Sequence, residues 1–398
     1  MISETQQALL NILGTHLFQK QPSDYRSVDW ASLLKEAEMQ TVFPIVYSVI
    51  EPYLPDEFAG TAKTEYFVHL ASSMRNAHQH GELHKLLSEH GVPYVIIKGM
   101  ASASYYPDPF LRSMGDVDFI VPKDRLEETK KLLTEEGYTA RENNRHHAHI
   151  AFHRGKEILE MHWEPNGLPE GEKREICRQY LDDLIERSTL YEIRDERFTV
   201  PDTFHHGLIL LLHTATHMIN TGIGLRHLCD WAVFAGKLSD EEFRALFEEK
   251  LKTVGLWRFA QLLTQLATRY LGCPEAAWAE EDDDPDFLEA MIEDIFASGN
   301  FGKKDVERIN EAKLMTVEST GSVERSNTVV LKVLTEKAYK EMPVCKKAKI
   351  LLPIGWLYVG IRHVILIIKG KRPKVHLNKM ISGAETRREI YTQFQLFH

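Results

Sequence analysis

The feature that most constrains the fold is a change of sequence pattern at Gly91. Before it, apolar residues such as Leu33, Leu34 and Ala37 recur at three- and four-residue steps, which is the period of one helical face. After it come short runs rich in β-branched and aromatic residues, which are typical of buried strands. Helical spacing returns at about Pro201. The chain is therefore expected to hold a sheet in its middle, with helices on both sides.

The middle segment alternates between the two kinds of element. Strands are expected at 92–97, 117–121, 149–154 and 158–163, a short helix at 100–105 and an amphipathic helix at 123–136. The order strand, helix, strand, helix, hairpin predicts a compact α+β unit. We therefore divide the chain into an N-terminal helical region (1–90), an α+β core (91–200) and a C-terminal helical domain (201–398).

Within the flanking regions, the clearest helices are expected at 64–89, 205–219, 226–235 and 241–270. Pro55 and Asp56 are expected to interrupt the N-terminal helical pattern. The acidic run at 280–285 is expected to be a solvated loop, because its neighbouring negative charges repel one another and its proline stops a helix.

Composition narrows the classes of function. The 398 residues carry a formal net charge of −10, which disfavours a protein that coats nucleic acid. The four cysteines form no CxxC pair, which fits a reducing compartment, and the first residues lack the pattern of a secretory signal. The most apolar stretch, 350–369, contains Pro353, Arg362 and His363, whereas a spanning helix needs ~20 nearly uncharged residues. We expect a cytoplasmic protein without a membrane span.

Three acidic residues in the core carry the strongest chemical signal. Asp116 and Asp118 flank one residue of an expected strand, so their side chains share a face, roughly 6–7 Å apart. Two carboxylates this close repel each other, and one stays protonated unless a cation lies between them. Carboxylate oxygens favour a hard ion, Mg²⁺ or Mn²⁺, which also binds substrate phosphates.

The third acid lies on a later strand. Glu160 shares a strand face with His162, while Leu159 and Met161 occupy the other face. A carboxylate in an apolar strand interior needs a partner, and a shared metal ion is one solution. Three carboxylates with two Mg²⁺ ions suit in-line phosphoryl or nucleotidyl transfer.

Cationic and flexible residues adjoin this acidic group. Lys98 and Arg112 are candidates to neutralise triphosphate oxygens, or alternatively to form salt bridges. Gly99 would let the backbone approach a phosphate closely. For His162, a structural role and a supporting role in the site both remain open.

The motifs Ile97-Lys98-Gly99, Tyr106-Pro-Asp-Pro109, Arg112-Ser-Met-Gly-Asp-Val-Asp118 and Glu160-Met-His-Trp163 together resemble the uncharacterised nucleotidyltransferase family. That family belongs to the DNA-polymerase-β-like nucleotidyltransferase superfamily. The resemblance implies a small mixed-sheet core in which Asp116, Asp118 and Glu160 bind metal. It also places Lys98-Gly99 where the superfamily has Gly-Ser at a helix start. Met100 follows the glycine here, so Ser102 is the candidate substitute for the serine.

The remaining histidines give weaker signals. His213 and His217 are four residues apart, which is zinc-ligand spacing, but Thr214 stands where a zinc protease has its glutamate and no third ligand is identifiable. Packing between helices, facing the site, is the simpler expectation. The cluster of His146, His147, His149 and His153 could contact phosphates or merely edge a strand.

These observations predict an Mg²⁺- or Mn²⁺-dependent nucleotidyltransferase. It would move an NMP, with AMP favoured, from an NTP to a hydroxyl or phosphate acceptor of unknown class: small molecule, lipid-linked, peptide or protein. One alternative is an antitoxin-type enzyme that nucleotidylates a partner protein, because the Lys-Gly…Asp-x-Asp pattern is similar there. Another is a nucleotide-binding or scaffold protein whose catalytic machinery has decayed, because the Gly-Ser serine is missing.

Overall fold

The structure is a computed structural model. It describes residues 2–302 except 23–24, 26–27, 142–148 and 281–283, and then residues 304, 335, 337–339, 341–368, 394 and 396–397. The predictions for His146, His147 and the centre of the acidic run lie outside the described residues.

The N-terminal region is helical, as predicted. Its helices are α1 (Glu4–Phe18), α2 (Trp30–Met39), α3 (Phe43–Ile50) and α4 (Asp56–Glu89). The prediction for α4 was wrong at its start, because the helix begins at Asp56 rather than Thr64. Pro55 occupies the N-cap position, and Asp56 and Glu57 supply negative charge in the first turn, where it is favourable. The predicted interruption is confirmed at Pro55, which lies between η1 (Glu51–Tyr53) and α4, whereas Asp56 already belongs to α4.

The middle of the described chain holds a small mixed sheet, which confirms the predicted α+β class. Its strands are β1 (Val95–Ile96), β2 (Val117–Ile120), β3 (Thr139–Arg141), β4 (His149–Arg154) and β5 (Glu157–His162), in the order β1-β2-β5-β4-β3. Strand β2 pairs with β5 in parallel, and the other neighbours are antiparallel. The expected helices are α5 (Met100–Ala103) and α6 (Leu126–Glu135). Strand β1 is shorter than predicted, and β3 was missed.

Two further elements before residue 200 were not predicted. They are helix α7 (Glu172–Tyr180) and a hairpin of β6 (Thr189–Ile193) and β7 (Glu196–Val200). The hairpin packs against α4: Phe198 is fully buried with its ring 5.1 Å from that of His80, and Glu196 contacts His78 at 2.7 Å. It thereby holds α4 beside the sheet.

The C-terminal part is helical, as predicted. Its described helices are α8 (Thr203–Asn220), α9 (Leu225–Ala235), α10 (Asp240–Val254), α11 (Trp257–Leu266), α12 (Pro285–Ser298), α15 (Val344–Lys347) and α16 (Leu352–Ile368). The single helix expected at 241–270 is divided, because Gly255 ends α10 with φ +71°. At the acidic run, Asp284 caps α12 and Pro285 is its first residue. No helix in the described residues is long and apolar enough to cross a membrane.

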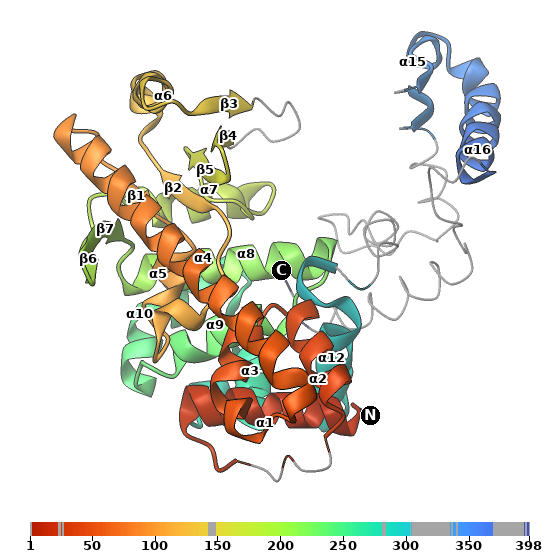
Figure 1. Cartoon of the computed structure of the whole chain (residues 1–398). Coiled ribbons are helices and arrows are strands. Elements are labelled where there is room, and N and C mark those ends of the chain that lie inside the picture. Colours follow the sequence, from red (N-terminus) through yellow and green to blue (C-terminus); the bar gives the residue numbers. More distant parts are fainter. Residues whose placement is uncertain are drawn as a thin grey trace.

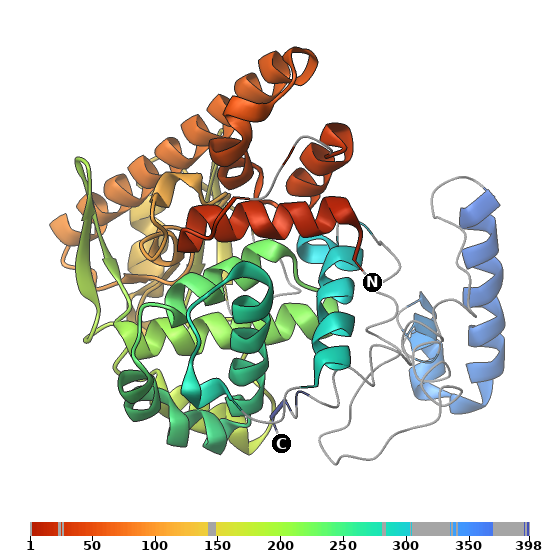
Figure 2. The ribbon, with the colours of Figure 1, turned by 90° about the horizontal axis from the view of Figure 1, so that it is seen from below.

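Buried side chains form two hydrophobic clusters. One joins α1, α2 and α3 to the helices from α8 to α12, and the other joins α4 and α6 to the sheet. Figure 1 shows α4 running from the N-terminal helices to the sheet, and Figure 2 shows the view from below, with α1 lying across the C-terminal helices. The division at residues 90 and 200 stays a prediction.

Candidate active site

The two central strands bring Asp118 and Glu160 side by side. Strands β2 and β5 are parallel, and their register places Asp118 opposite Glu160 and Val117 opposite Leu159. Because side chains alternate along a strand, the two acids share one face, whereas Val117 and Leu159 are buried on the other. Asp118 and His162 form a hydrogen bond on this face, although they are 44 positions apart in the sequence.

His162 links the two acids. Its Nε2 lies 3.0 Å from Asp118 Oδ1 and 3.5 Å from Glu160 Oε2, and the side chain is fully buried. His149 lies opposite His162 on β4, with the two rings 4.9 Å apart and its Nε2 3.9 Å from Glu160 Oε2. His149, Glu160 and His162 thus place ligand atoms close enough together to hold a metal ion. The prediction had placed His149 only in a loose phosphate-contact cluster.

Lys98 extends this network from the end of β1. Its Nζ donates to Asp118 Oδ1 at 2.7 Å, and its side chain is 18% exposed. Burial alone would raise the pKa of Asp118, but Lys98 and His162 together lower it below its usual value. Burial lowers the pKa of His162, and its hydrogen bonds to Asp118 and Glu160 outweigh that effect and raise it. Asp118 is therefore ionised and paired.

Asp116 is the acid of this group whose pKa is raised. Burial, followed by the charges of Asp118 and Glu160, raises its pKa to about 6, and Lys98 offsets only part of this. The three acids thus act on one another electrostatically, although they come from two separate segments. Carboxylate oxygens of this kind are the ligands that Mg²⁺ and other hard divalent cations prefer.

Helix α4 positions the two loops that carry these residues. Asn76 Nδ2 donates to the carbonyl of Gly115 at 3.1 Å, just before Asp116. One turn further on, His80 packs against Gly99: a Cβ added to the glycine would lie 3.3 Å from His80 Nε2. Gly99 has φ +49° and ψ −116°, a backbone conformation that side chains resist. Glycine is therefore required at this turn. Ser102, the candidate serine, is buried within α5.

Arg112 lies in a buried ion pair. Its Nε and Nη2 donate to the two carboxylate oxygens of Asp230 at 2.7 and 2.8 Å, and its Nη1 donates to the carbonyl of Gly99 at 3.3 Å. Tyr106 donates a further hydrogen bond to Asp230 at 2.7 Å. The guanidinium is thus occupied by protein groups. Its visible role is to hold α9 and the Gly99 turn together, and the predicted contact with phosphate stays a prediction.

Sequence reasoning missed a basic group on the helical side of the site. The rings of His213 and His217 on α8 are 4.4 Å apart, and the ring of His227 on α9 lies 5.9 and 5.7 Å from them. Arg226 lies beside them with its guanidinium 5.1 Å from the ring of Phe301. The i, i+4 spacing of the first two signalled half of this cluster, but nothing in the sequence announces His227 or Arg226 as their neighbours.

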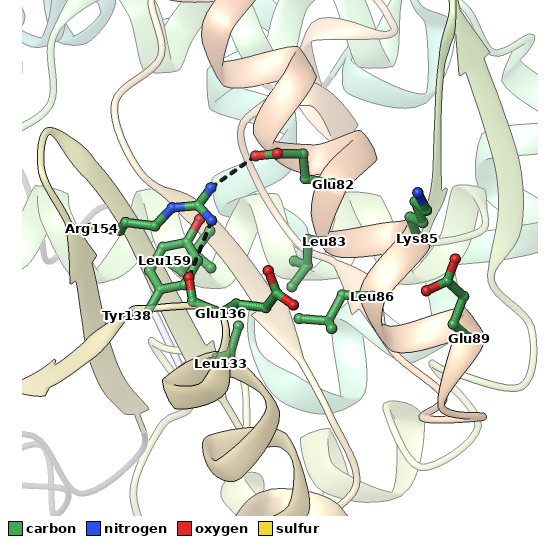
Figure 3. A pocket seen from close by; sticks show the side chains of 10 residues that line it. All are labelled: Glu82, Leu83, Lys85, Leu86, Glu89, Leu133, Glu136, Tyr138, Arg154 and Leu159. Atoms are coloured by element: carbon green, nitrogen blue, oxygen red, sulfur yellow. Dashed lines mark hydrogen bonds and ion pairs between the residues drawn. The ribbon is translucent and has the colours of Figure 1, made fainter.

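A pocket among the described residues lies away from these acidic and basic groups. A cavity of about 230 Å³ between α4, α6 and the β4–β5 hairpin is lined by Leu83, Leu133, Tyr138, Arg154 and Leu159, among others. Figure 3 shows Arg154 crossing it to Glu82. Leu159 points to the sheet face opposite Glu160, so this cavity is separate from the acidic group.

The comparisons with solved structures give distant likenesses. The antibiotic-resistance factor ANT(2'')-Ia is 14% identical over 42% of this chain and 85% of its own, with a TM-score of 0.30. An antigenic nucleotidyltransferase-like protein from Paracoccidioides brasiliensis is 15% identical over 52% of this chain and 97% of its own, with a TM-score of 0.35. A tRNA-processing enzyme is 14% identical, covering 85% of this chain and 98% of its own, with a TM-score of 0.23. Such low values add nothing to the assignment of function.

The family comparison is decisive. No curated protein matches the sequence. The family model of the uncharacterised nucleotidyltransferases, however, matches residues 26–272, which is more than half of the chain and includes every residue of the candidate site described so far except Phe301. The protein belongs to the uncharacterised nucleotidyltransferase family.

Proposed function

We propose that this nucleotidyltransferase moves an NMP, with AMP favoured, from an NTP to a hydroxyl or phosphate acceptor, and that it does so with Mg²⁺ or Mn²⁺. The observation that carries the proposal is the pairing of Asp118 with Glu160 on parallel strands, with Asp116 two residues away. The family match supports the transfer of a nucleotidyl group. The acidic cluster supports the metal, and the nucleotide and the acceptor are our extension.

The acids suit a divalent cation on chemical grounds. Burial, followed by the charges of Asp118 and Glu160, raises the pKa of Asp116, so a cation that neutralises these charges would lower that pKa. Asp116, Asp118 and Glu160 would hold the metal, with His162 and His149 as nitrogen donors at the same face. When bound, such ions activate an attacking hydroxyl and stabilise the pyrophosphate leaving group.

The residues around the acids would bind and orient the triphosphate. Lys98 has three donor protons, of which Asp118 takes one, and its partial exposure lets it reach a phosphate oxygen as well. Gly99 keeps the backbone free of a side chain beside it. In this proposal Arg112 acts as a positioning residue, since it grips the carbonyl of Gly99 while Asp230 balances its charge. Ser102 remains the candidate hydroxyl at this turn.

The test is a screen of the four NTPs with Mg²⁺ or Mn²⁺, with cell extract as the acceptor pool and released pyrophosphate as the readout. The double variant Asp116→Asn, Asp118→Asn should lose NTP turnover by at least about a thousandfold, because the metal ligands would be gone. Asp124→Asn, an exposed acid outside the site, is the matched control. Circular dichroism and thermal unfolding would check that both variants fold.

Unchanged pyrophosphate release in the double variant would refute the proposed site. Metal-dependent NTP binding without any pyrophosphate release, with every acceptor pool, would instead support a decayed nucleotide-binding protein. A gain of one nucleotide in mass on a protein of the extract would identify the acceptor as a partner protein.

A further inference from the structure

The helical side of the site contains a half-buried arginine that lacks an acidic partner. Arg226 is the second residue of α9, where the positive end of the helix dipole disfavours a cation. Its Nη1 donates to the carbonyl of Ser113 at 3.3 Å, its Nε has no hydrogen-bond partner, and it forms no ion pair within the described chain. Burial, followed by the nearby charge of Arg112, lowers its pKa. A half-buried guanidinium whose Nε is buried without a partner is costly unless an anion joins it.

The comparison with Arg112 sharpens this point. Arg112 approaches α9 and Arg226 belongs to it, but Asp230 of α9 binds Arg112 through both of its oxygens and forms no ion pair with Arg226. The guanidinium of Arg112 therefore has a bidentate acidic partner, whereas that of Arg226 contacts a carbonyl oxygen and an aromatic ring.

A second unpartnered donor lies next to Arg226. His227 is 1% exposed, and its Nδ1 accepts a hydrogen bond from the backbone N–H of Gly224 at 3.3 Å. In the neutral ring the proton is consequently on Nε2, which is buried without a hydrogen-bond partner. The Nε2–H of His227 is thus a hydrogen-bond donor without an acceptor among the described residues.

The other two histidines complete the cluster. Burial lowers the pKa values of both, that of His217 to about 4, and the charges of Lys98 and Arg226 act in the same direction. Their rings are therefore neutral at pH 7 and offer N–H donors without added charge. Arg226 contacts the segment that leads to Asp116, through the carbonyl of Ser113, and Lys98 and Asp116 act electrostatically on the cluster.

A strained segment closes one side of this cluster. Phe301 has φ +56° and ψ 33°, a left-handed conformation that is unfavourable for an aromatic residue, and its ring lies 4.6 Å from that of His217 and 5.1 Å from that of His227. Close packing holds it there, since a Cβ on Gly224 would lie 2.7 Å from the backbone of Asn300. The ring is 38% exposed, so the segment covers the cluster only in part.

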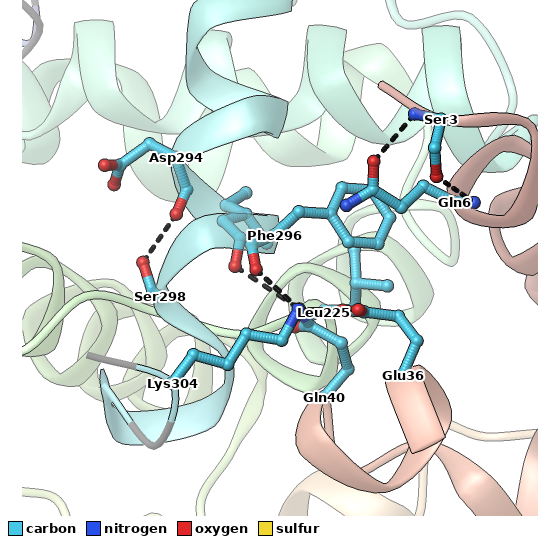
Figure 4. A network of polar contacts seen from close by, with 10 residues as sticks. Ser3, Gln6, Glu36, Gln40, Leu225, Asp294, Phe296, Ser298 and Lys304 are labelled. Carbon is cyan, nitrogen blue, oxygen red and sulfur yellow. Dashed lines mark hydrogen bonds and ion pairs between the residues drawn. The ribbon is translucent and has the colours of Figure 1, made fainter. Parts of the chain in front are cut away.

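A polar network fixes the same corner of the molecule. Gln40, the C-cap residue of α2, accepts a hydrogen bond from the backbone N–H of Leu225 at 2.9 Å and donates to the carbonyls of Ile295 and Phe296. Lys304 joins the carbonyl of Phe296 to Glu36, as Figure 4 shows. The start of α9, which carries Arg226 and His227, is therefore held in place before any ligand arrives.

We propose that Arg226, His213, His217 and His227 form a binding site for a phosphoryl group. A guanidinium and neutral imidazole N–H groups are donors, which suit a tetrahedral oxyanion, and the positive charge of Arg226 disfavours a metal cation among the histidines. The site extends the proposed function, on which the identity of its ligand rests. That ligand is either the triphosphate of the NTP or a phosphate on the acceptor.

The test measures binding rather than turnover, so it is independent of the transfer reaction. Calorimetry with inorganic pyrophosphate, in the presence of a chelator, should show binding to the wild-type chain. Arg226→Met should weaken it by at least about tenfold, because a charge-assisted contact is lost. Arg197→Met removes an arginine that is 64% exposed on β7 and should change nothing. His217→Gln, in a half-buried position, is a second variant and should weaken binding by a smaller factor.

Two further arms identify the ligand. With a saturating non-hydrolysable NTP analogue present, inorganic phosphate should either be excluded, which assigns the site to the triphosphate, or still bind in an Arg226-dependent manner, which assigns it to the acceptor. Pyrophosphate binding that is absent in the wild-type chain, or that is equal in the wild-type chain and in both variants, would overturn the proposal. Either result would leave the metal-dependent pyrophosphate release of the previous section to be judged separately.

Discussion

The sheet side and the helical side of the site are built by different means. On the sheet, Asp118, Glu160 and His162 lie on strands β2 and β5, and the hydrogen-bonded register fixes their spacing. On the helical side, Arg226 and His227 depend on how α9 packs against segments from α2 to residue 301. The pairing of two strands fixes these side chains through a regular set of backbone hydrogen bonds, whereas helix packing fixes them through separate contacts with several segments. The helical side should therefore be the more sensitive to substitutions outside the site.

The largest effect is expected where the helical side is anchored. Arg112→Met leaves Asp230 buried without its partner, so the free energy of unfolding should fall by about 3–5 kcal/mol. Urea unfolding measures this. The double variant Arg112→Met, Asp230→Leu removes both charges and should recover a large part of the loss. A double variant as unstable as the single one would show that packing, rather than the unpaired carboxylate, dominates.

On the sheet side, the charge of Asp116 makes stability depend on pH. Its raised pKa of about 6 means that the folded chain keeps a proton which the unfolded chain, with a pKa near 4, has lost. Stability from this group is present below pH 4 and is lost as pH rises to 6, by on the order of 2 kcal/mol.

The metal-free Asp116→Asn variant lacks this titrating group, so it should not lose this stability between pH 4 and pH 7. Its free energy of unfolding should therefore rise relative to that of the wild-type chain as pH rises. Unfolding experiments in a chelator at both pH values measure the difference, with Asp124→Asn as the control. A difference from the wild-type chain that is the same at pH 4 and pH 7 would contradict the prediction.

Gly99 lies where the two sides meet, and its substitution tests both. Gly99→Ala forces a side chain onto a backbone with φ +49° and places Cβ 3.3 Å from His80, so the free energy of unfolding should fall by about 2 kcal/mol. Gly91→Ala, also at positive φ but with open space around it, is the control for backbone strain alone. Equal losses in the two variants would mean that contact with His80 adds nothing.

The smallest effect is expected at Phe301. Phe301→Gly relieves the left-handed strain but removes the ring contacts with His217 and His227, so the two effects oppose each other. The free energy of unfolding should change by less than about 1 kcal/mol, as measured by urea unfolding. A much larger loss would show that this ring is an essential part of the helical packing.

The sequence predicted the sheet side well, because strand alternation is a local property. The strands that carry Asp118 and Glu160 follow from local sequence pattern, and the shared face of Glu160 and His162 follows from two-residue periodicity. The parallel pairing of these two strands, which brings Asp118 beside Glu160, was not predicted. Beyond local pattern the predictions failed. The partner of Arg112 is Asp230, 118 residues away, and no spacing rule connects them. The hairpin β6–β7 was missed because its alternation is weak and its outer face is exposed.

Helix α9 carries both Asp230, which balances Arg112, and Arg226, one turn earlier. A substitution that shifts this helix along its axis would alter the Gly99 turn and the proposed phosphoryl site in a single movement. Losses of activity from separate α9 variants should then fail to add up, and a double-mutant cycle across the helix should report strong coupling. In a screen of random variants, defects in catalysis would accumulate along α9 even at residues that never touch a substrate.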